Sequence, residues 1–255
     1  MQNAMDYPSV VFLSSLVAMS LSSWIGANLL RKVKALTTES REDFNVVQAA
    51  TLTLLALMIG FSFSMAVGRY DQRKNLEEEE ANAIGTEFVR ADLLPAAQAQ
   101  QVRVLLTRYL EQRVKFYKTR DAQELEQINR TTTELQGGLW AAVRDAAAAQ
   151  PTPVAALAVA GMNDVLNSQG YTQAAWWNRI PIAAWGLMVA IAVGCNLLVG
   201  YGARTPKLGL TLLAVLPLVV ATSFALIADI DSPRGGIIRV NPINLVSTAQ
   251  SLNPH

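Results

Sequence analysis

Charged residues are absent from four long stretches of this chain of 255 residues, and each stretch is 21 to 25 residues long and mostly apolar. An α-helix needs about 20 residues to cross the roughly 30 Å hydrocarbon core of a bilayer. The pattern therefore predicts four transmembrane helices. They are expected near Val10–Leu30, Val46–Gly68, Ile182–Tyr201 and Leu208–Ala228.

A polar segment, Arg69 to Arg179, separates the second and third apolar stretches and carries 13 basic and 14 acidic residues. It is rich in Glu, Gln, Ala, Leu and Arg, which favour helix, and Pro and Gly residues divide it. The expected helices are Tyr70–Asp92, Ala96–Lys118, Ala122–Ala149 and Pro153–Asn167. The first of these is expected to continue from the second transmembrane helix without a break.

These elements predict an all-α membrane protein with four transmembrane helices and a helical extramembrane domain inserted between helices 2 and 3. Residues 1–68 would hold transmembrane helices 1 and 2, and residues 69–179 the extramembrane domain. Residues 180–230 would hold transmembrane helices 3 and 4. Residues 231–255 would form a C-terminal tail, which its Pro and Gly residues predict to be extended or loosely ordered.

Composition removes several function classes. The chain is 51% hydrophobic and 16% charged with a net charge of +1, so it lacks the basic excess of a nucleic-acid-binding protein. A single cysteine excludes an intramolecular disulfide and a cysteine-based zinc site, and a single histidine, His255, excludes an ordinary Ser-His-Asp triad. No phosphate-binding loop, dinucleotide-binding glycine motif or zinc-protease motif occurs. We therefore expect no enzyme, no metal and no cofactor.

The second transmembrane helix carries two adjacent stripes of four-residue spacing, and such positions share one helix face. One stripe is small, and small residues allow membrane helices to approach closely; its members are Ala56, Gly60, Ser64 and Gly68. The other stripe is bulkier and comprises Thr53, Leu57, Phe61 and Met65. Either both stripes pack inside a four-helix bundle, or one packs against a neighbour while the other faces a wider space.

The stretch from Leu57 to Arg69, in which Gly60-Phe61 is followed by Arg69-Tyr70, resembles the pore helix of the bestrophin anion channels. Further short motifs occur in matching order: Glu80-Ala81-Asn82-Ala83, Arg108-Tyr109, and the ending Asp231-Ser232-Pro233, Gly235, Arg239-Val240. Over nearly its full length, the chain resembles the bacterial bestrophin-like family of four-span membrane proteins.

The resemblance implies an oligomeric ion channel in which five subunits form a ring around one pore, with a narrow hydrophobic neck on the second helix. Carried onto this chain, the neck positions are Thr53, Leu57 and Phe61, and Thr53 departs from the apolar pattern. The implied partners are the lipid bilayer, further copies of this chain and a small inorganic ion, chloride foremost. The implied location is the plasma (inner) membrane, as a multi-pass protein.

Two further points bear on this resemblance. Bestrophins under calcium control carry an acidic clasp after the fourth helix, whereas the tail here offers only Asp229 and Asp231, which does not support calcium control. The resemblance places the middle domain in the cytoplasm, while the basic residues near the membrane ends are balanced, six on each side, so the positive-inside rule does not orient the chain.

Charged residues near the second helix are candidates for a pore mouth or for ion pairing. Arg69 could snorkel, pair with Asp71 or Glu80, or attract anions at a pore mouth. Glu80 and Asn82 match the family pattern and are expected to be buried or to face the pore, although a ring of Glu80 would disfavour anions. Glu77 to Glu79 are expected on a solvated helix surface, because consecutive residues spread around the helix. Asp229 is expected to have a basic partner such as Arg234, because a helix C-terminus disfavours negative charge.

Two function classes remain open. The first is an oligomeric ion channel gated at the hydrophobic neck. The second is a non-conducting, membrane-anchored helical module for sensing or assembly. A closed ring with an axial path favours the channel, because four apolar helices from one chain carry too few polar groups to line a pore alone.

Overall fold

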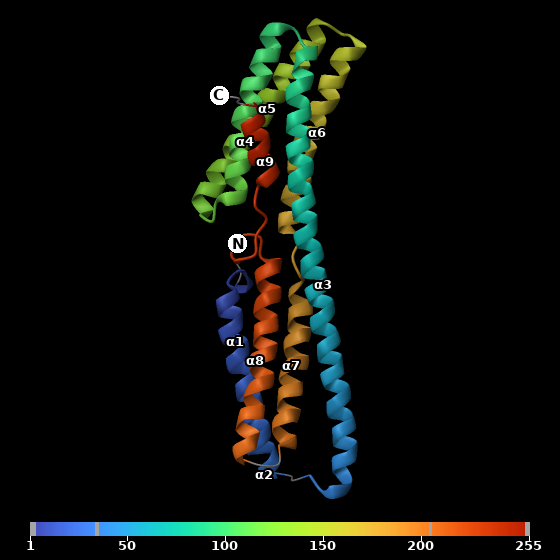
Figure 1. The fold of residues 1–255 in the computed structure, drawn as a ribbon, viewed down its shortest axis with the longest axis vertical. Coiled ribbons are helices and arrows are strands. Elements are labelled where there is room, and N and C mark those ends of the chain that lie inside the picture. Colours follow the sequence, from blue (N-terminus) through green and yellow to red (C-terminus); the bar gives the residue numbers. More distant parts are fainter. Residues whose placement is uncertain (1–3, 34–35, 204–205, 253–255) are drawn as a thin grey trace. The chain divides into compact units, whose positions relative to one another are not determined.

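The computed structural model describes residues 4–33, 36–203 and 206–252 of the chain, and every regular element in these ranges is helical (Figure 1). The longer elements are α1 (Pro8–Ile25), α3 (Thr38–Arg90), α4 (Ala96–Lys118), α5 (Ala122–Ala149), α6 (Pro153–Trp177), α7 (Ile182–Gly202), α8 (Pro206–Asp231) and α9 (Ile243–Leu252). The short elements are η1 (Ala4–Asp6), the π-helical turn η2 (Gly26–Leu30), α2 (Arg31–Val33) and η3 (Ala91–Leu93). The predicted all-α class is therefore confirmed.

Among the described residues, four helical stretches contain a segment long and apolar enough to cross a membrane, as the gaps in charge predict. These segments lie within Pro8–Leu30, Glu39–Leu93, Pro153–Gly202 and Leu213–Asp231. The expected continuation of the second span into the polar segment is confirmed, because α3 is a single helix of 53 residues. Both α4 and α5 have the predicted bounds. Three residues named or counted in the sequence analysis lie outside the described residues. They are His255 and two of the basic residues counted near the membrane ends, Lys34 and Arg204.

Two expected boundaries are wrong. The helix expected to end at Asn167 continues to Trp177, because Ser168, Thr172 and Trp176 prolong its buried face. The C-terminal tail is not extended or loosely ordered throughout, because it contains α9. This short helix packs its fully buried Leu245 into the adjoining core.

The chain forms two compact units. Unit 1 comprises residues 1–69 and 179–239, and its described part contains α1, α7, α8 and the first part of α3. In Figure 1, α1 runs side by side with α7 and α8. Helix α7 lies very close to α1 and to the adjoining η2, because a Cβ at Gly26 of η2 would overlap the carbonyl oxygen of Leu197, and one at Gly200 would overlap that of Ser23 in α1. Ser22 Oγ also donates to the carbonyl oxygen of Val193 over 2.7 Å. Small residues thus join two helices here, as in membrane proteins generally.

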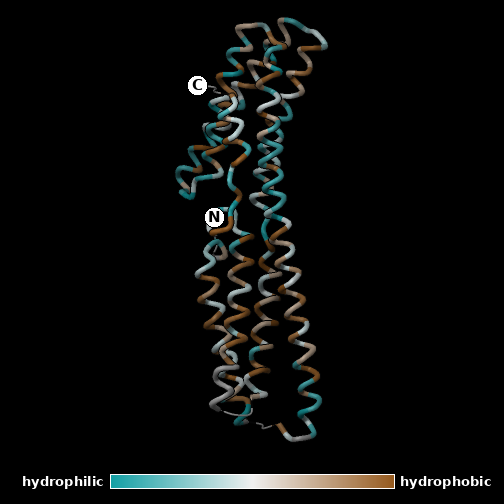
Figure 2. The backbone as a smooth tube through the Cα atoms, viewed as in Figure 1, coloured by the Kyte–Doolittle hydropathy of each residue, from teal (hydrophilic) through white to brown (hydrophobic). Residues whose placement is uncertain are grey.

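Unit 2 comprises residues 70–178 and 240–255, and its described part contains the second part of α3 together with α4, α5, α6 and α9. Leu106, Tyr109, Phe116, Val143 and Met162 are fully buried in its core. Figure 2 shows the difference between the units, with apolar residues predominating along α1, α7 and α8 and polar residues along the second part of α3.

Candidate functional site

The first part of α3 uses one face to pack inside unit 1. Leu55, Ser62 and Ala66 are buried, and their spacings of seven and four residues put them on one side of the helix. Cys195 on α7 donates its Sγ–H to the carbonyl oxygen of Thr51 over 3.3 Å. The ring centroid of Phe44 lies 5.5 Å from that of Tyr201. These contacts fix which face of α3 turns inward.

Both predicted stripes lie on the other side of α3 and are exposed. Leu57 is 51% exposed and Phe61 is 63% exposed, and Thr53 and Met65 are exposed with them. The small residues Ala56, Gly60, Ser64 and Gly68 are exposed as well. The alternative in which both stripes pack inside a four-helix bundle of one chain is therefore wrong.

This outward face has open space in front of it within the single chain. A Cβ built at Gly60 or at Gly68 meets no atom within 4 Å. The hydroxyl of Thr53 donates to the carbonyl oxygen of Ala49 over 2.9 Å, so its polar hydrogen is satisfied by its own helix. The face consequently presents apolar and small side chains, and the Thr53 hydroxyl on it needs no partner from another helix.

Ion pairs join α3, α8 and η1 of unit 1 through Arg179, which lies in the connection between α6 and α7. Arg69 Nη1 lies 3.9 Å from Asp231 Oδ1, so Arg69 pairs with Asp231 rather than with Asp71 or Glu80. Arg179 donates from Nε to the same carboxylate over 3.2 Å and pairs with Asp6 over 2.5 Å. The backbone N–H of Ile180 also donates to Asp231. Sequence reasoning missed Arg179 and Asp6 in this network, because both lie far from Asp231 in the chain.

Asp229 finds its donors in the backbone instead of in a basic side chain. Its two carboxylate oxygens accept the N–H groups of Ile237 and Ile238, each over 2.8 Å. The expected pairing with Arg234 is not among these contacts. Over the residues that the structure describes, no cluster of three or more His, Cys, Asp or Glu side chains could hold a metal ion.

Glu80 lies in unit 2 and is fully buried. Arg113 on α4 donates from Nε to one carboxylate oxygen, and Tyr117 and Thr172 donate to the other over 3.3 Å each. Burial raises the pKa of Tyr117, and the negative charge of Glu80 raises it further. Asn82, two residues on, is exposed. The geometry thus gives Glu80 an ion pair inside the protein.

The run of four glutamates does not behave as one solvated surface. Glu78 and Glu79 are exposed as expected, but Glu77 is buried, and that expectation is wrong for it. Its carboxylate accepts the backbone N–H of Leu245 over 2.9 Å and the side-chain amide of Asn244 over 2.7 Å. Glu77 therefore caps the first turn of α9, where an anion is favourable.

Comparisons with known proteins agree on a family and a fold. A family model described as a Bestrophin-like domain matches residues 16–245. A structure of a bacterial bestrophin homologue from Klebsiella pneumoniae has a TM-score of 0.67 at 14% identity, covering 94% of this chain and 96% of that one. A single-substitution variant of that homologue has a TM-score of 0.67 at 13% identity, covering 94% and 93%.

A further structure, described as a membrane protein variant, has a TM-score of 0.68 at 12% identity and covers 96% of this chain and 99% of that one. No curated protein matches the chain. At such low identity, the structural matches establish a shared fold over almost the full length.

Proposed function

The chain belongs to the bestrophin-like family, and from this premise we propose that it assembles into an oligomeric membrane ion channel that conducts anions, chloride foremost. The pore neck is formed by Thr53, Leu57 and Phe61. One observation carries the proposal: α3 buries Leu55, Ser62 and Ala66 against its own chain and leaves the neck stripe exposed on the opposite side.

A ring of subunits accounts for that exposed stripe. Around a closed symmetric assembly, one copy of Leu57 and one of Phe61 from each subunit would form successive apolar rings. Hydrophobic constrictions of this kind gate by dewetting, and the positive edge of an aromatic ring tolerates an anion. Five subunits follow from the resemblance to bestrophins.

The small stripe fits the contact between neighbouring subunits. Ala56, Gly60, Ser64 and Gly68 lie beside the neck stripe on α3, and the open space at Gly60 and Gly68 leaves room for a second helix. Small residues allow two helix backbones to approach closely in lipid. Residues 69–179 then form the extramembrane domain, in keeping with their charge, and the assembly belongs to the plasma (inner) membrane.

Current through a planar bilayer tests the proposal. Purified oligomer is placed under a chloride gradient with impermeant cations, and the expected reversal potential lies at the chloride equilibrium value. Phe61→Ala is expected to raise the conductance or to hold the pore open, because it removes one apolar ring of the gate.

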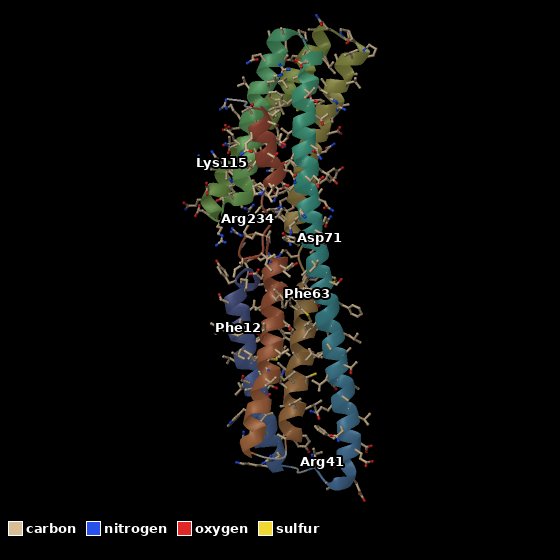
Figure 3. All side chains as sticks on the ribbon, viewed as in Figure 1. Phe12, Arg41, Phe63, Asp71, Lys115 and Arg234 are labelled. Carbon is tan, nitrogen blue, oxygen red and sulfur yellow. The ribbon has the colours of Figure 1, made fainter. Side chains whose placement is uncertain are left out.

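Phe63→Ala is the matched control. Phe63, labelled in Figure 3, is the same residue type two positions along α3 and points about 200° around the helix from Phe61. A demonstrated pore whose current is unaltered by Phe61→Ala would rule out the neck assignment. Silence from folded, oligomeric Phe61→Ala protein would favour the non-conducting membrane-anchored module.

A further inference from the structure

Glu87 is a buried glutamate that lacks hydrogen-bond donors of the kind that Glu77 and Glu80 have. It lies on α3 in unit 2, about 28 Å along the helix beyond Gly68. Its side chain is fully buried, and among the described residues neither carboxylate oxygen accepts a hydrogen bond. Glu77 and Glu80, on the same helix face, each accept at least two. Glu87 therefore needs a different explanation.

The partner surface of Glu87 is the backbone of α6 at Gly161. A Cβ at Gly161 would overlap the Oε2 atom of Glu87 and would lie 2.6 Å from Nη1 of Arg90. Gly161 is itself buried. The carboxyl group thus fills the place that a side chain at position 161 would take, and the contact between α3 and α6 closes over it.

The charges around Glu87 do not balance its negative form. Arg90 lies on its own helix and Asp164 lies one turn beyond Gly161 on α6. Burial raises the pKa of Glu87 to about 8, with Arg90 lowering it and Asp164 raising it. The balance of these influences keeps the carboxyl group protonated at neutral pH.

The other helices of unit 2 bring no charge that changes this balance. On α4, Arg103 pairs with Asp92 and donates to the carbonyl oxygen of Phe88. Helix α9, which reaches Gly85 through Thr248, has no titratable side chain between Ile243 and Leu252. On α5, the neighbouring residues Arg144 and Asp145 are exposed and form an ion pair with each other.

We propose that Glu87 is a proton-binding site, whose neutral acid packs against Gly161 to close the contact between α3 and α6, and whose ionised form weakens that contact. A neutral carboxylic acid is far cheaper to bury than an unpaired carboxylate. The inference concerns the packing of unit 2 and does not depend on ion conduction.

The sign of the pH dependence follows from linkage. The folded protein holds the Glu87 proton up to about pH 8, whereas the unfolded chain releases it near the ordinary value of 4.5. Between those values the folded state binds more protons, so its stability falls as the pH rises. The loss through Glu87 is complete above about pH 8, and the full contribution is present below the ordinary value.

Infrared spectroscopy of the full-length protein detects the proton directly. The band of a protonated, buried carboxyl group is expected at about pH 6 and is expected to disappear with a midpoint near pH 8. The band should be missing from Glu87→Gln and unchanged in Glu79→Gln, which alters an exposed glutamate on the same helix. Asp164→Asn should lower the midpoint, since it removes a negative charge that favours the proton.

Hydrogen exchange measures the coupling to packing. Corrected for intrinsic rates, the amide protection of α6 around Gly161 should fall several-fold in the wild type as the pH rises from about 6 to about 9, and should fall less in Glu87→Gln. A wild type with no carboxyl band titrating over this range would overturn the proposal. So would a band that persists in Glu87→Gln, or a midpoint that Asp164→Asn leaves in place.

Discussion

Along α3, the residues that face the rest of the chain change character near Arg69. Before this point the inward side chains are Leu55, Ser62 and Ala66, and the outward ones include Leu57 and Phe61. After it, the apolar Ala81 and Ile84 are still buried, but four charged residues face inward beside them: Arg73, Glu77, Glu80 and Glu87. One continuous helix thus buries only small and apolar side chains in unit 1, and adds ionisable ones in unit 2.

The difference reflects the two solvents that the sequence implies. In lipid an outward Phe or Leu costs nothing, so hydrophobicity does not drive helices together, and close approach of small residues does. In water an outward glutamate costs nothing, but an inward one must be paired, capped or protonated. Glu80, Glu77 and Glu87 provide one example of each solution.

The largest expected effect concerns the paired carboxylate. Arg113→Ala leaves the buried Glu80 without its cation, and removal of one partner of a buried pair costs about 3–5 kcal/mol. Denaturant unfolding of the full-length protein, followed by hydrogen exchange in α4, measures the loss. The control is Arg130→Ala, which breaks an exposed pair with Glu126 and should cost less than about 1 kcal/mol. Equal losses in both variants would contradict the contrast between buried and exposed pairs.

A smaller effect is expected where unit 1 packs small residues. Gly200→Ala places a methyl group against the backbone of Ser23, which cannot swing aside, and overpacking of this kind costs roughly 1–3 kcal/mol. Gly194→Ala, on the same helix, meets no atom within 4 Å and should leave the thermal unfolding midpoint unchanged or slightly higher. A fall of the same size in Gly194→Ala would show that the effect does not come from the contact with α1.

A substitution in the outward small stripe is expected to have the smallest effect on the fold of the single chain. Its effect is expected on the assembly of subunits instead. Gly60→Ala meets no atom within its own chain, so helicity by circular dichroism should stay unchanged. The proposed contact between subunits should weaken by about 1 kcal/mol, or roughly fivefold, because a methyl group holds two helices apart. Mass photometry of the detergent-solubilised protein measures the oligomer fraction. Gly186→Ala, an open position on α7, serves as the control, and an unchanged oligomer in Gly60→Ala would remove this stripe from the interface.

Local signals explain which helix bounds could be predicted. Pro95 precedes α4, the carboxylate of Asp121 accepts the N–H of Glu124 at the start of α5, and Thr152 caps α6 ahead of Pro153. Each signal lies within a few residues of the boundary that it marks. In contrast, α9 is capped by Glu77, which is distant in the chain, so no local pattern predicts the start of this helix.

In the candidate site too, features set by local spacing could be predicted, whereas features set by distant partners could not. The two stripes on α3 follow from four-residue spacing alone, and the structure places both on one outward side. Which face of the helix would be buried could not be read from hydrophobicity, since both faces are apolar in this stretch. Composition likewise could not predict the burial of Glu77 and Glu87, because a glutamate-rich helix has the composition of a solvated surface until its partners are known. Only the resemblance to the family favoured a buried or pore-facing Glu80, which the structure buries.

The glycine contact between α1 and α7 also has a consequence for how the protein is made. Ser22 and its acceptor Val193 are separated by 171 residues, so α1 leaves the ribosome long before α7 exists. At synthesis rates of about 5–20 residues per second, the interval is roughly ten to thirty seconds. During that time α7 is not yet present to cover Ser22 of α1 and the adjoining Gly26. The close contact between α1 and α7 can therefore form only after most of the chain has been synthesised.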